Sequence, residues 1–172
     1  VRAVLDGGPS HARALWREVA DMGWLGAAFP AEYGGADLGY EGLCVIAEEL
    51  GRVLAPIPVA SSIYLTAEVI LAAASESEKR ALLPWLADGS LIGTFALAEG
   101  PGRPAPGAVQ LSAVGGMLTG EKWPVADGII ADFAIVVARD EEGIGLYRVD
   151  LAGKGVKRTA LRERLARDEP VW

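Results

Sequence analysis

Few side chains in this sequence could carry out chemistry by themselves. The chain has a single histidine, His11, and a single cysteine, Cys44, which are too few for a zinc site or for a Cys–His nucleophile pair. We expect Cys44 to be a small core residue of a helix and His11 to be a solvated residue in the first turn of another. The adjacent carboxylates Glu48–Glu49 and Glu141–Glu142 point apart in a helix or a turn, so we interpret them as solvated faces.

Two glycine-rich segments have the composition of phosphate-binding loops. Gly115 and Gly120 have the spacing of a Walker loop, but Glu121 occupies the lysine position and would repel phosphates. The segment Gly100–Gly107 contains three prolines, which cannot supply the N–H donors of an anion cradle. We therefore predict a β-turn in the first segment and no phosphate site in either. The residues alone name no reaction.

The composition indicates a globular protein with a substantial core. Its 172 residues suffice for one large domain or two small ones, and 51% are hydrophobic. The net charge of −7 argues against a nucleic-acid partner, because phosphate contacts need clustered Lys and Arg. No apolar run approaches the ~18 residues that cross a bilayer, and residues 1–8 lack the apolar region of a signal peptide. With one cysteine, these features predict a cytoplasmic protein without membrane contact.

Residues 10–88 have the periodicity of helices. Apolar residues spaced three and four apart, with capping residues at the ends, predict helices over Ser10–Met22, Tyr40–Leu50, Ala60–Ala74 and Ser75–Gly89. Ser10 is the expected cap of the first helix. The third is apolar on nearly every face, which predicts burial between neighbours. The fourth begins with a capping box, in which Glu78 follows Ser75 by three residues.

After Gly89 the apolar residues recur at every second position, a spacing that is typical of strands. Strands are expected over Leu91–Leu97, Ala108–Val114, Met117–Leu118, Phe133–Arg139, Gly145–Val149 and Gly155–Ala160. Residues 113–117 and 140–144 have the composition of hairpin connections. Helices followed by strands exclude the alternating order of a doubly wound fold. The sequence thus predicts an α+β protein, with a helical bundle over 1–89 and a mostly antiparallel β-barrel or sandwich-like domain over 90–172.

Several stretches of the sequence together form a specific pattern. The segment Gly23–Gly35 reads GWLGAAFPAEYGG and resembles the loop G-[WL]-x-G-x-x-x-P-x-E-Y-G-G of acyl-CoA dehydrogenases. Further stretches resemble motifs of the same family in order and spacing: Glu48–Gly51, Phe95–Glu99, Gly120–Lys122 with Ala131–Asp132, and Val136–Arg139. The similarity covers roughly residues 12–162. Each motif alone is modest, but their combination is specific.

The resemblance implies an N-terminal α domain, a middle β domain and a C-terminal helical domain, the last being absent from this chain. Such enzymes hold FAD between the middle and C-terminal domains and usually form homotetramers. A glutamate in the C-terminal half removes the α-proton of an acyl-CoA thioester while hydride passes from the β-carbon to flavin N5. Electron-transfer flavoprotein is the implied acceptor. No catalytic residue is therefore expected in this chain, which we interpret as an inactive fragment of an oligomeric oxidoreductase.

The first cofactor segment that the resemblance implies follows the helical half. Phe95 stands where the family has an aromatic residue beside the flavin, and Leu97 where it has a backbone contact. Ala98 replaces a threonine whose hydroxyl would bond the flavin ring. Glu99 and Gly100 occupy the implied substrate-binding positions. The loop that follows lacks the serine and aspartate of the family's P-x-x-G-S-D.

The second cofactor segment, Lys122–Gly128, stands where the family has K-x-W-I-T-x-G. Pro124 occupies the aromatic position, Trp123 lies one residue early, and Ala126 replaces a second threonine; Val125 is a further implied contact. A one-residue offset in a strand turns a side chain to the opposite face, so Trp123 cannot simply be assumed to cover the flavin. Two or three lost neutral hydrogen bonds would weaken FAD binding ~10- to 1000-fold unless backbone donors compensate.

Two versions of the function remain open at this point. The chain belongs either to a divergent FAD-binding dehydrogenase or to a flavin-poor partner subunit of a heteromeric one; the non-enzymatic alternative is a scaffold that retains the fold. We expect exposed apolar surface on the third and fourth helices and on the sheet. The small residues Ala60, Ser61 and Ser62 either leave room for a bulky acyl group or permit close helix packing.

Overall fold

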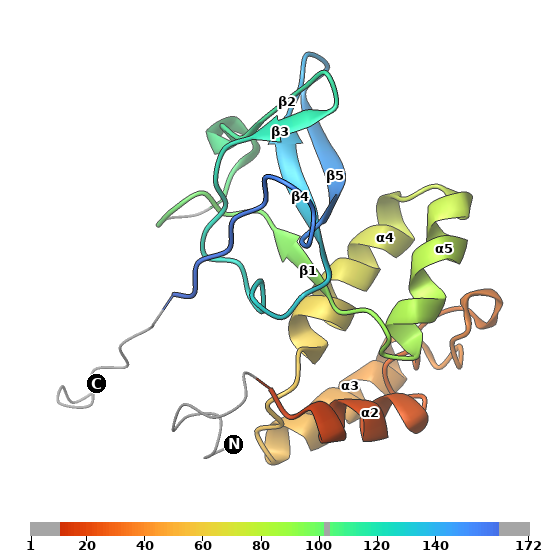
Figure 1. Ribbon diagram of the computed structural model, residues 1–172. Coiled ribbons are helices and arrows are strands. Elements are labelled where there is room, and N and C mark those ends of the chain that lie inside the picture. The colour runs from red at the N-terminus through yellow and green to blue at the C-terminus, as the bar shows by residue number, and fades with distance from the viewer. Residues whose placement is uncertain (1–10, 102–103, 162–172) are drawn as a thin grey trace, which may run out of the picture.

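The computed structural model describes residues 11–101 and 104–161. Helices form one half of the molecule and a sheet forms the other (Figure 1). The elements in chain order are α2 (Arg13–Asp21), the 3-10 turn η1 (Ala31–Tyr33), α3 (Gly39–Arg52), the π-helix η2 (Ala60–Ala67), α4 (Glu68–Ala73), α5 (Glu76–Ala87), β1 (Gly93–Ala96), the 3-10 turn η3 (Pro106–Ala108), β2 (Ser112–Val114), β3 (Met117–Thr119), β4 (Phe133–Arg139) and β5 (Ile144–Asp150). This order confirms the α+β class, and no helix longer than a turn follows β1 in the described residues.

The helices follow the apolar spacing of the sequence. On α3, the buried residues Leu43, Ile46 and Leu50 recur at three and four positions. At the start of α5, the Ser75 hydroxyl accepts from the Glu78 N–H, and the Glu78 carboxylate accepts from the Ser75 N–H, so the capping box is confirmed. The first helix begins at Arg13, later than expected, and its expected cap Ser10 lies outside the described residues.

Two expectations for single residues were wrong. Cys44 is exposed rather than buried, because it lies one residue from Leu43, and one residue turns the side chain about 100° around the helix axis. His11 is buried, with 7% of its surface exposed, and precedes α2 instead of lying in its first turn. Burial lowers the pKa of His11, and Arg13 lowers it further, while Asp127 acts in the opposite direction.

The expected third helix is formed by η2 and α4 in continuous succession. The Thr66 hydroxyl donates to the carbonyl of Ser61 at 2.7 Å, within the wider turns of the π-helix. This segment packs directly on β1: the Gly93 N–H donates to the Ser62 hydroxyl at 3.1 Å. A Cβ atom on Gly93 would lie 2.6 Å from Thr66 Cγ2. The small buried residues Ser61 and Ser62 therefore permit close packing of the helix on the sheet, which favours that interpretation over an acyl pocket.

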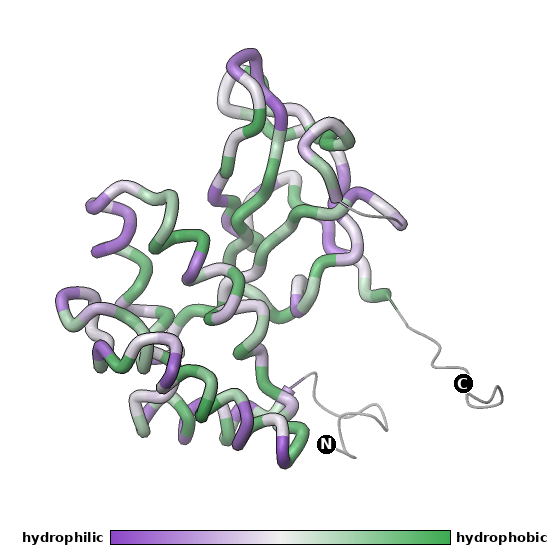
Figure 2. Tube along the Cα trace, turned by 180° about the vertical axis from the view of Figure 1, so that it is seen from behind, coloured by the Kyte–Doolittle hydropathy of each residue, from purple (hydrophilic) through white to green (hydrophobic). Residues whose placement is uncertain are grey.

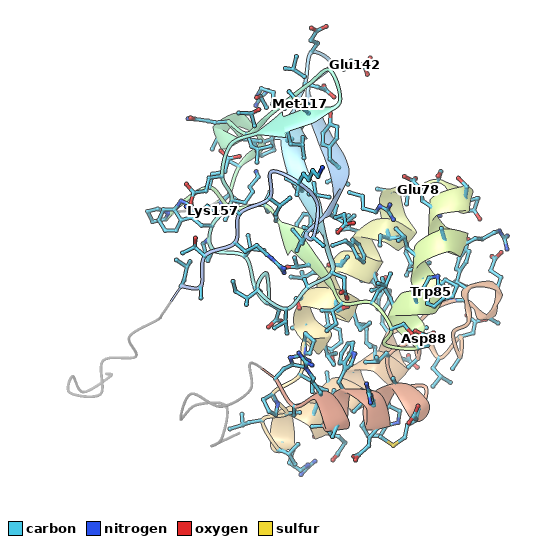
Figure 3. The ribbon with its side chains drawn as sticks, in the orientation of Figure 1. Glu78, Trp85, Asp88, Met117, Glu142 and Lys157 are labelled. Atoms are coloured by element: carbon cyan, nitrogen blue, oxygen red, sulfur yellow. The ribbon has the colours of Figure 1, made fainter. Side chains whose placement is uncertain are left out.

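The sheet is built around β4. Its whole length pairs antiparallel with β5, and its first half pairs parallel with β1, Gly93 opposite Phe133. β2 and β3 form a hairpin whose turn, Gly115–Gly116, has positive φ at both residues. Both expected hairpin connections are confirmed, and the exposed Glu141–Glu142 pair lies in the connection between β4 and β5, where Figure 3 labels Glu142. Figure 2 shows that this end of the sheet is hydrophilic at its tip.

Two expected strands are markedly shorter in the structure, and a third does not form. The first strand is restricted to Gly93–Ala96, and the second to Ser112–Val114 because η3 and hydrogen bonds to Glu99 occupy the preceding residues. The expected strand Gly155–Ala160 was wrong, because the chain there is not extended along β5. Residues 150–156 form turns, and the Arg158 guanidinium then bonds carbonyl groups of residues 128–131. These contacts draw the segment away from the edge of the sheet.

The buried apolar residues lie on both faces of β4. Phe133 and Ile135 belong to the core that the helices share with the sheet. The alternate residues Ala134, Val136 and Ala138 belong to a second, smaller cluster on the opposite face. Because helices and sheet share the larger core, they pack as one body in the described residues.

Apolar side chains also remain on the surface, as expected. On α5, Trp85 is 53% exposed (Figure 3), and Leu65 of η2 is 45% exposed. On β5, Ile144 and Leu146 are 41% and 45% exposed. Across the described residues, no helix is long and apolar enough to cross a membrane.

Candidate functional site

The two segments that the sequence marks for cofactor contacts lie side by side. The Trp123 N–H donates to the carbonyl of Ala98 at 2.9 Å, and the Gly100 N–H donates to the carbonyl of Trp123 at 2.9 Å. These bonds form a parallel bridge between Glu99 and Trp123, beyond the end of β1. Residues far apart in sequence are thereby held at one edge of the sheet.

An ion pair beneath this bridge fixes both segments. The Lys122 ammonium donates to the Glu99 carboxylate at 2.6 Å and to the carbonyl of Leu97 at 3.1 Å. The same carboxylate accepts from the N–H groups of Gln110 and Leu111 at 2.8 and 3.0 Å. The Lys122 side chain is 5% exposed and that of Glu99 is 17% exposed. Glu99 thus joins three stretches of chain, and its carboxylate is already committed to partners within the protein.

The pKa of Glu99 reflects these contacts. Burial by itself would raise the pKa, but the hydrogen bonds from Lys122, Gln110 and Leu111 outweigh it and hold the pKa below the ordinary value of 4.5. A carboxylate with a depressed pKa contributes stability that is present above its ordinary pKa and is lost as the pH falls through its folded-state value.

Stability should therefore decrease on acidification, and part of this decrease should depend on Glu99. We expect the urea midpoint of the wild-type chain to fall as the pH is lowered below about 4.5, and the Glu99→Gln variant to show a shallower fall. Urea unfolding measured across this pH range, with Glu18→Gln on the exposed face of α2 as a control, tests the assignment. If the urea midpoints of wild type and Glu99→Gln fell equally with pH, the assignment to Glu99 would be contradicted.

A turn over Val125–Ala131 follows the bridge and is held from three sides. The Thr94 hydroxyl of β1 donates to the carbonyl of Ala126 at 2.6 Å. The Ser61 hydroxyl of η2 donates to the Asp127 carboxylate at 2.6 Å. One nitrogen of Arg158, after β5, donates to the carbonyls of residues 128, 129 and 131 at 3.0–3.3 Å. The roles of Thr94, Asp127 and Arg158 could not be predicted from the sequence, in which the Asp-Gly dipeptide at 127–128 is a local signal of a turn.

The expected cofactor residues surround this bridge with different exposure. Phe95 is half-buried against the large core, and Val125 is half-buried against the smaller one. Trp123 is 42% exposed and Ala126 is exposed. Leu97 and Ala98, with the expected substrate positions Glu99 and Gly100, line a shallow pocket of about 80 Å³. Ligand sites are usually about 300–1,000 Å³, so this pocket is too small to enclose a cofactor by itself.

The exposed backbone of the turn offers donors for a ligand. Within residues 11–101 and 104–161, the N–H groups of Val125 and Ala126 donate to no other group. Gly100 has a φ of +132°, and a Cβ there would lie 3.4 Å from the Trp123 ring. A glycine at this position therefore suits the backbone conformation and leaves the edge of the pocket free of a side chain. The surface combines an aromatic ring, apolar side chains and free N–H groups, which suits a flat heteroaromatic ligand.

Comparisons with known proteins show which protein family has this architecture. A family model described as the acyl-CoA dehydrogenase N-terminal domain matches residues 3–90. The protein named acyl-CoA dehydrogenase FadE27, from Mycobacterium tuberculosis (strain ATCC 25618 / H37Rv), is 31% identical over 151 residues and covers 87% of this chain. The chain belongs to the acyl-CoA dehydrogenase family. It spans 40% of the length of FadE27.

Solved structures of this oxidoreductase family share the fold. The ChsE4-ChsE5 complex from Mycobacterium tuberculosis aligns with a TM-score of 0.77 and 31% identity, over 88% of this chain and 41% of that chain. A glutaryl-CoA dehydrogenase from Mycobacterium smegmatis in complex with FADH2 aligns with a TM-score of 0.74 and 28% identity, over 90% of this chain and 42% of that chain. The helical part followed by the sheet is thus the arrangement of acyl-CoA dehydrogenases.

The loop that carries the strongest sequence motif of this acyl-CoA dehydrogenase family member has a structural role. The Tyr33 hydroxyl donates to the Glu76 carboxylate at 2.7 Å, which raises the pKa of Tyr33 to about 12. Arg80 lies 5.7 Å from the centre of the Tyr33 ring and pairs with Glu32 at 2.7 Å. These contacts attach the loop to α5, away from the bridge between Glu99 and Trp123.

Proposed function

We propose that this chain forms the helical and sheet wall of a flavin-dependent dehydrogenase that desaturates an acyl-CoA thioester between its α- and β-carbons. The observation that carries the proposal is the bridge that brings residues 97–100 beside residues 123–126. In this family fold, these are the segments expected to face FAD. The base that removes the α-proton is a glutamate outside this chain, so the chain by itself binds and orients and does not turn over substrate.

Each residue of this wall has a separate part in the proposal. The free N–H groups of Val125 and Ala126 orient the flavin ring, and Phe95 and Trp123 offer apolar surface beside it. FAD supplies the acceptor for the hydride that leaves the β-carbon. Gly100 forms the edge of the pocket beside which the thioester lies. Glu99 contributes by holding this edge through Lys122, because its carboxylate is already occupied.

Restoration of the missing hydroxyls tests whether this wall faces FAD. We expect Ala98→Thr and Ala126→Thr each to tighten FAD binding by about 2- to 10-fold, because one neutral hydrogen bond contributes about 0.5–1.5 kcal/mol. FAD titration followed by flavin fluorescence measures the affinity. Ala72→Thr, on the exposed surface of α4, is the matched control. Unchanged affinity in both test variants would contradict the proposal.

A flavin-poor subunit of a heteromeric dehydrogenase is the second candidate. Two observations favour it: alanine stands at both hydroxyl positions, 98 and 126, and a structural neighbour is the ChsE4-ChsE5 complex. In that case the chain pairs with a flavin-bearing paralogue, with electron-transfer flavoprotein as the acceptor of the assembly. A count of FAD per subunit in the assembled oligomer distinguishes the candidates, since one FAD per chain requires the first. An oligomer without FAD would leave only the scaffold role.

A further inference from the structure

The turn Val125–Ala131 is anchored to the helical half through an aspartate. Asp127 has a φ of +55°, a left-handed conformation that non-glycine residues seldom adopt. Its carbonyl accepts from the N–H groups of Ile130 and Ala131, and the Gly128 N–H donates to the carbonyl of Val125. The conformation of Asp127 therefore determines the direction of the backbone on both sides.

The partner of Asp127 is rigidly placed. Ser61 has 1% of its surface exposed and lies in the π-helix η2, which packs on β1. Its hydroxyl has one proton and two acceptors, the Asp127 carboxylate at 2.6 Å and the carbonyl of Pro58 at 3.2 Å. The shorter, charge-assisted bond to Asp127 is the stronger of the two. The helical half thus holds the turn through this side chain.

Positions adjacent to the turn have lost the groups that would otherwise orient a ligand. Alanine stands at 98 and 126, so the N–H groups of Val125 and Ala126, which immediately precede Asp127, are among the donors that remain on this surface. A backbone donor can replace a side-chain hydroxyl only if its direction is fixed before the ligand binds. The Ser61–Asp127 bond, together with the Thr94 bond to the carbonyl of Ala126, holds the turn that carries these N–H groups.

We propose that Asp127, held by Ser61, is the positioning residue that directs the Val125 and Ala126 N–H groups toward the cofactor and so replaces the missing hydroxyls. The inference rests on the proposed function for the identity of the ligand. It assigns a role to Ser61 on the helical side and to Asp127 in the turn, neither of which lines the pocket formed by residues 97–100.

Four variants separate this role from a general loss of structure. Ser61→Ala removes the bond and keeps Asp127. Asp127→Gly removes the carboxylate from a residue whose φ glycine adopts freely, so backbone strain cannot explain its effect. Asp127→Asn retains an acceptor for Ser61 and is the rescue variant. Ser62→Ala is the matched control, because Ser62 is equally buried but binds the Gly93 N–H of β1.

Amide hydrogen exchange gives a readout that needs no cofactor. In Ser61→Ala and Asp127→Gly we expect the N–H groups of residues 128, 130 and 131 to exchange about tenfold faster or more, the scale for a lost hydrogen bond to a charged group. Asp127→Asn should stay within about threefold of wild type. Ser62→Ala should leave these groups unchanged and accelerate exchange at Gly93. Wild-type exchange in Ser61→Ala, or equal acceleration in Ser62→Ala, would overturn the proposal.

FAD titration of the same variants extends the test to the ligand. If the wild-type chain binds FAD, Ser61→Ala and Asp127→Gly should weaken binding about tenfold, with Asp127→Asn and Ser62→Ala within about threefold. Unchanged affinity in the first two would refute the positioning role. A wild-type chain that binds no FAD counts against the proposed function instead, and the exchange data then decide whether Asp127 fixes the turn.

Discussion

Replacement of Lys122 by methionine should lower the free energy of unfolding by about 3–5 kcal/mol, the largest effect that we expect from a single side chain in this molecule. The substitution keeps the length of the side chain but leaves the Glu99 carboxylate, 17% exposed, without its cation. Two backbone N–H groups would remain as its partners, which is insufficient for a carboxylate taken out of water. Urea unfolding at neutral pH measures the loss.

The control is an ion pair on the surface of α3. Arg52 and Glu49 approach to 3.2 Å, but their side chains are 63% and 52% exposed. Arg52→Met should therefore cost less than about 1 kcal/mol. The double variant Lys122→Met/Glu99→Gln should recover part of the loss, because no buried charge is then left unpaired. Similar losses for Lys122→Met and Arg52→Met would show that burial does not determine the strength of the Lys122–Glu99 pair.

Substitution of Gly35 by alanine should cost about 3 kcal/mol or more, through overlap with the backbone. A Cβ on Gly35 would lie 2.0 Å from the carbonyl oxygen of Phe29, and this carbonyl accepts from the Asp37 N–H. Phe29 is fully buried, so the loop has no room to yield. Thermal unfolding should show a large fall in the midpoint.

The helical glycine Gly51 provides the comparison for this loop. A Cβ on Gly51 would meet nothing within 4 Å, and the residue lies in α3, where alanine is favoured over glycine by about 0.5–1 kcal/mol. Gly51→Ala should thus be neutral or stabilising. A midpoint for Gly35→Ala close to that of wild type would contradict the close approach of the two backbone segments.

Much of the fold could be predicted because its signals are local. The capping box at Ser75 and the turn at Gly115–Gly116 depend on residues adjacent in sequence, and both were found where expected. Burial of single residues was harder to predict. His11 is buried although it precedes α2, and Cys44 is exposed because Leu43 and Ile46, rather than Cys44, lie on the buried face of α3.

The geometry of the candidate site was predicted only in part. The resemblance marked the two segments, but no local pattern indicates that Lys122 reaches Glu99 or that Ser61 reaches Asp127. Such contacts depend on how the helical half packs against the sheet, which is determined by many distant residues. The same reasoning explains the error over Gly155–Ala160: its alternation suits a strand, whereas the tertiary contacts of Arg158 direct the chain elsewhere.

The glycine-rich loop at residues 30–35 shows that the most recognisable motif need not be the chemical one. Its tyrosine and glutamate attach to α5 through Glu76 and Arg80, and its second glycine admits no side chain. The surface expected to face the cofactor relies instead on main-chain groups, which place few demands on residue identity. The motif thus identifies the family through its architecture, while the ligand contacts can diverge.

The alternation of residues along β4 gives the molecule two separately adjustable sides. Phe133 and Ile135 pack on the helices, whereas Ala134 and Ala138 face the cluster against which Val125 of the turn also packs. An enlargement at either alanine would disturb the packing of this smaller cluster, whereas a change at Ile135 would disturb the core that the helices share with the sheet. Substitutions at one set of alternate positions could therefore alter the side of the sheet against which Val125 packs while the helical packing stays as it is.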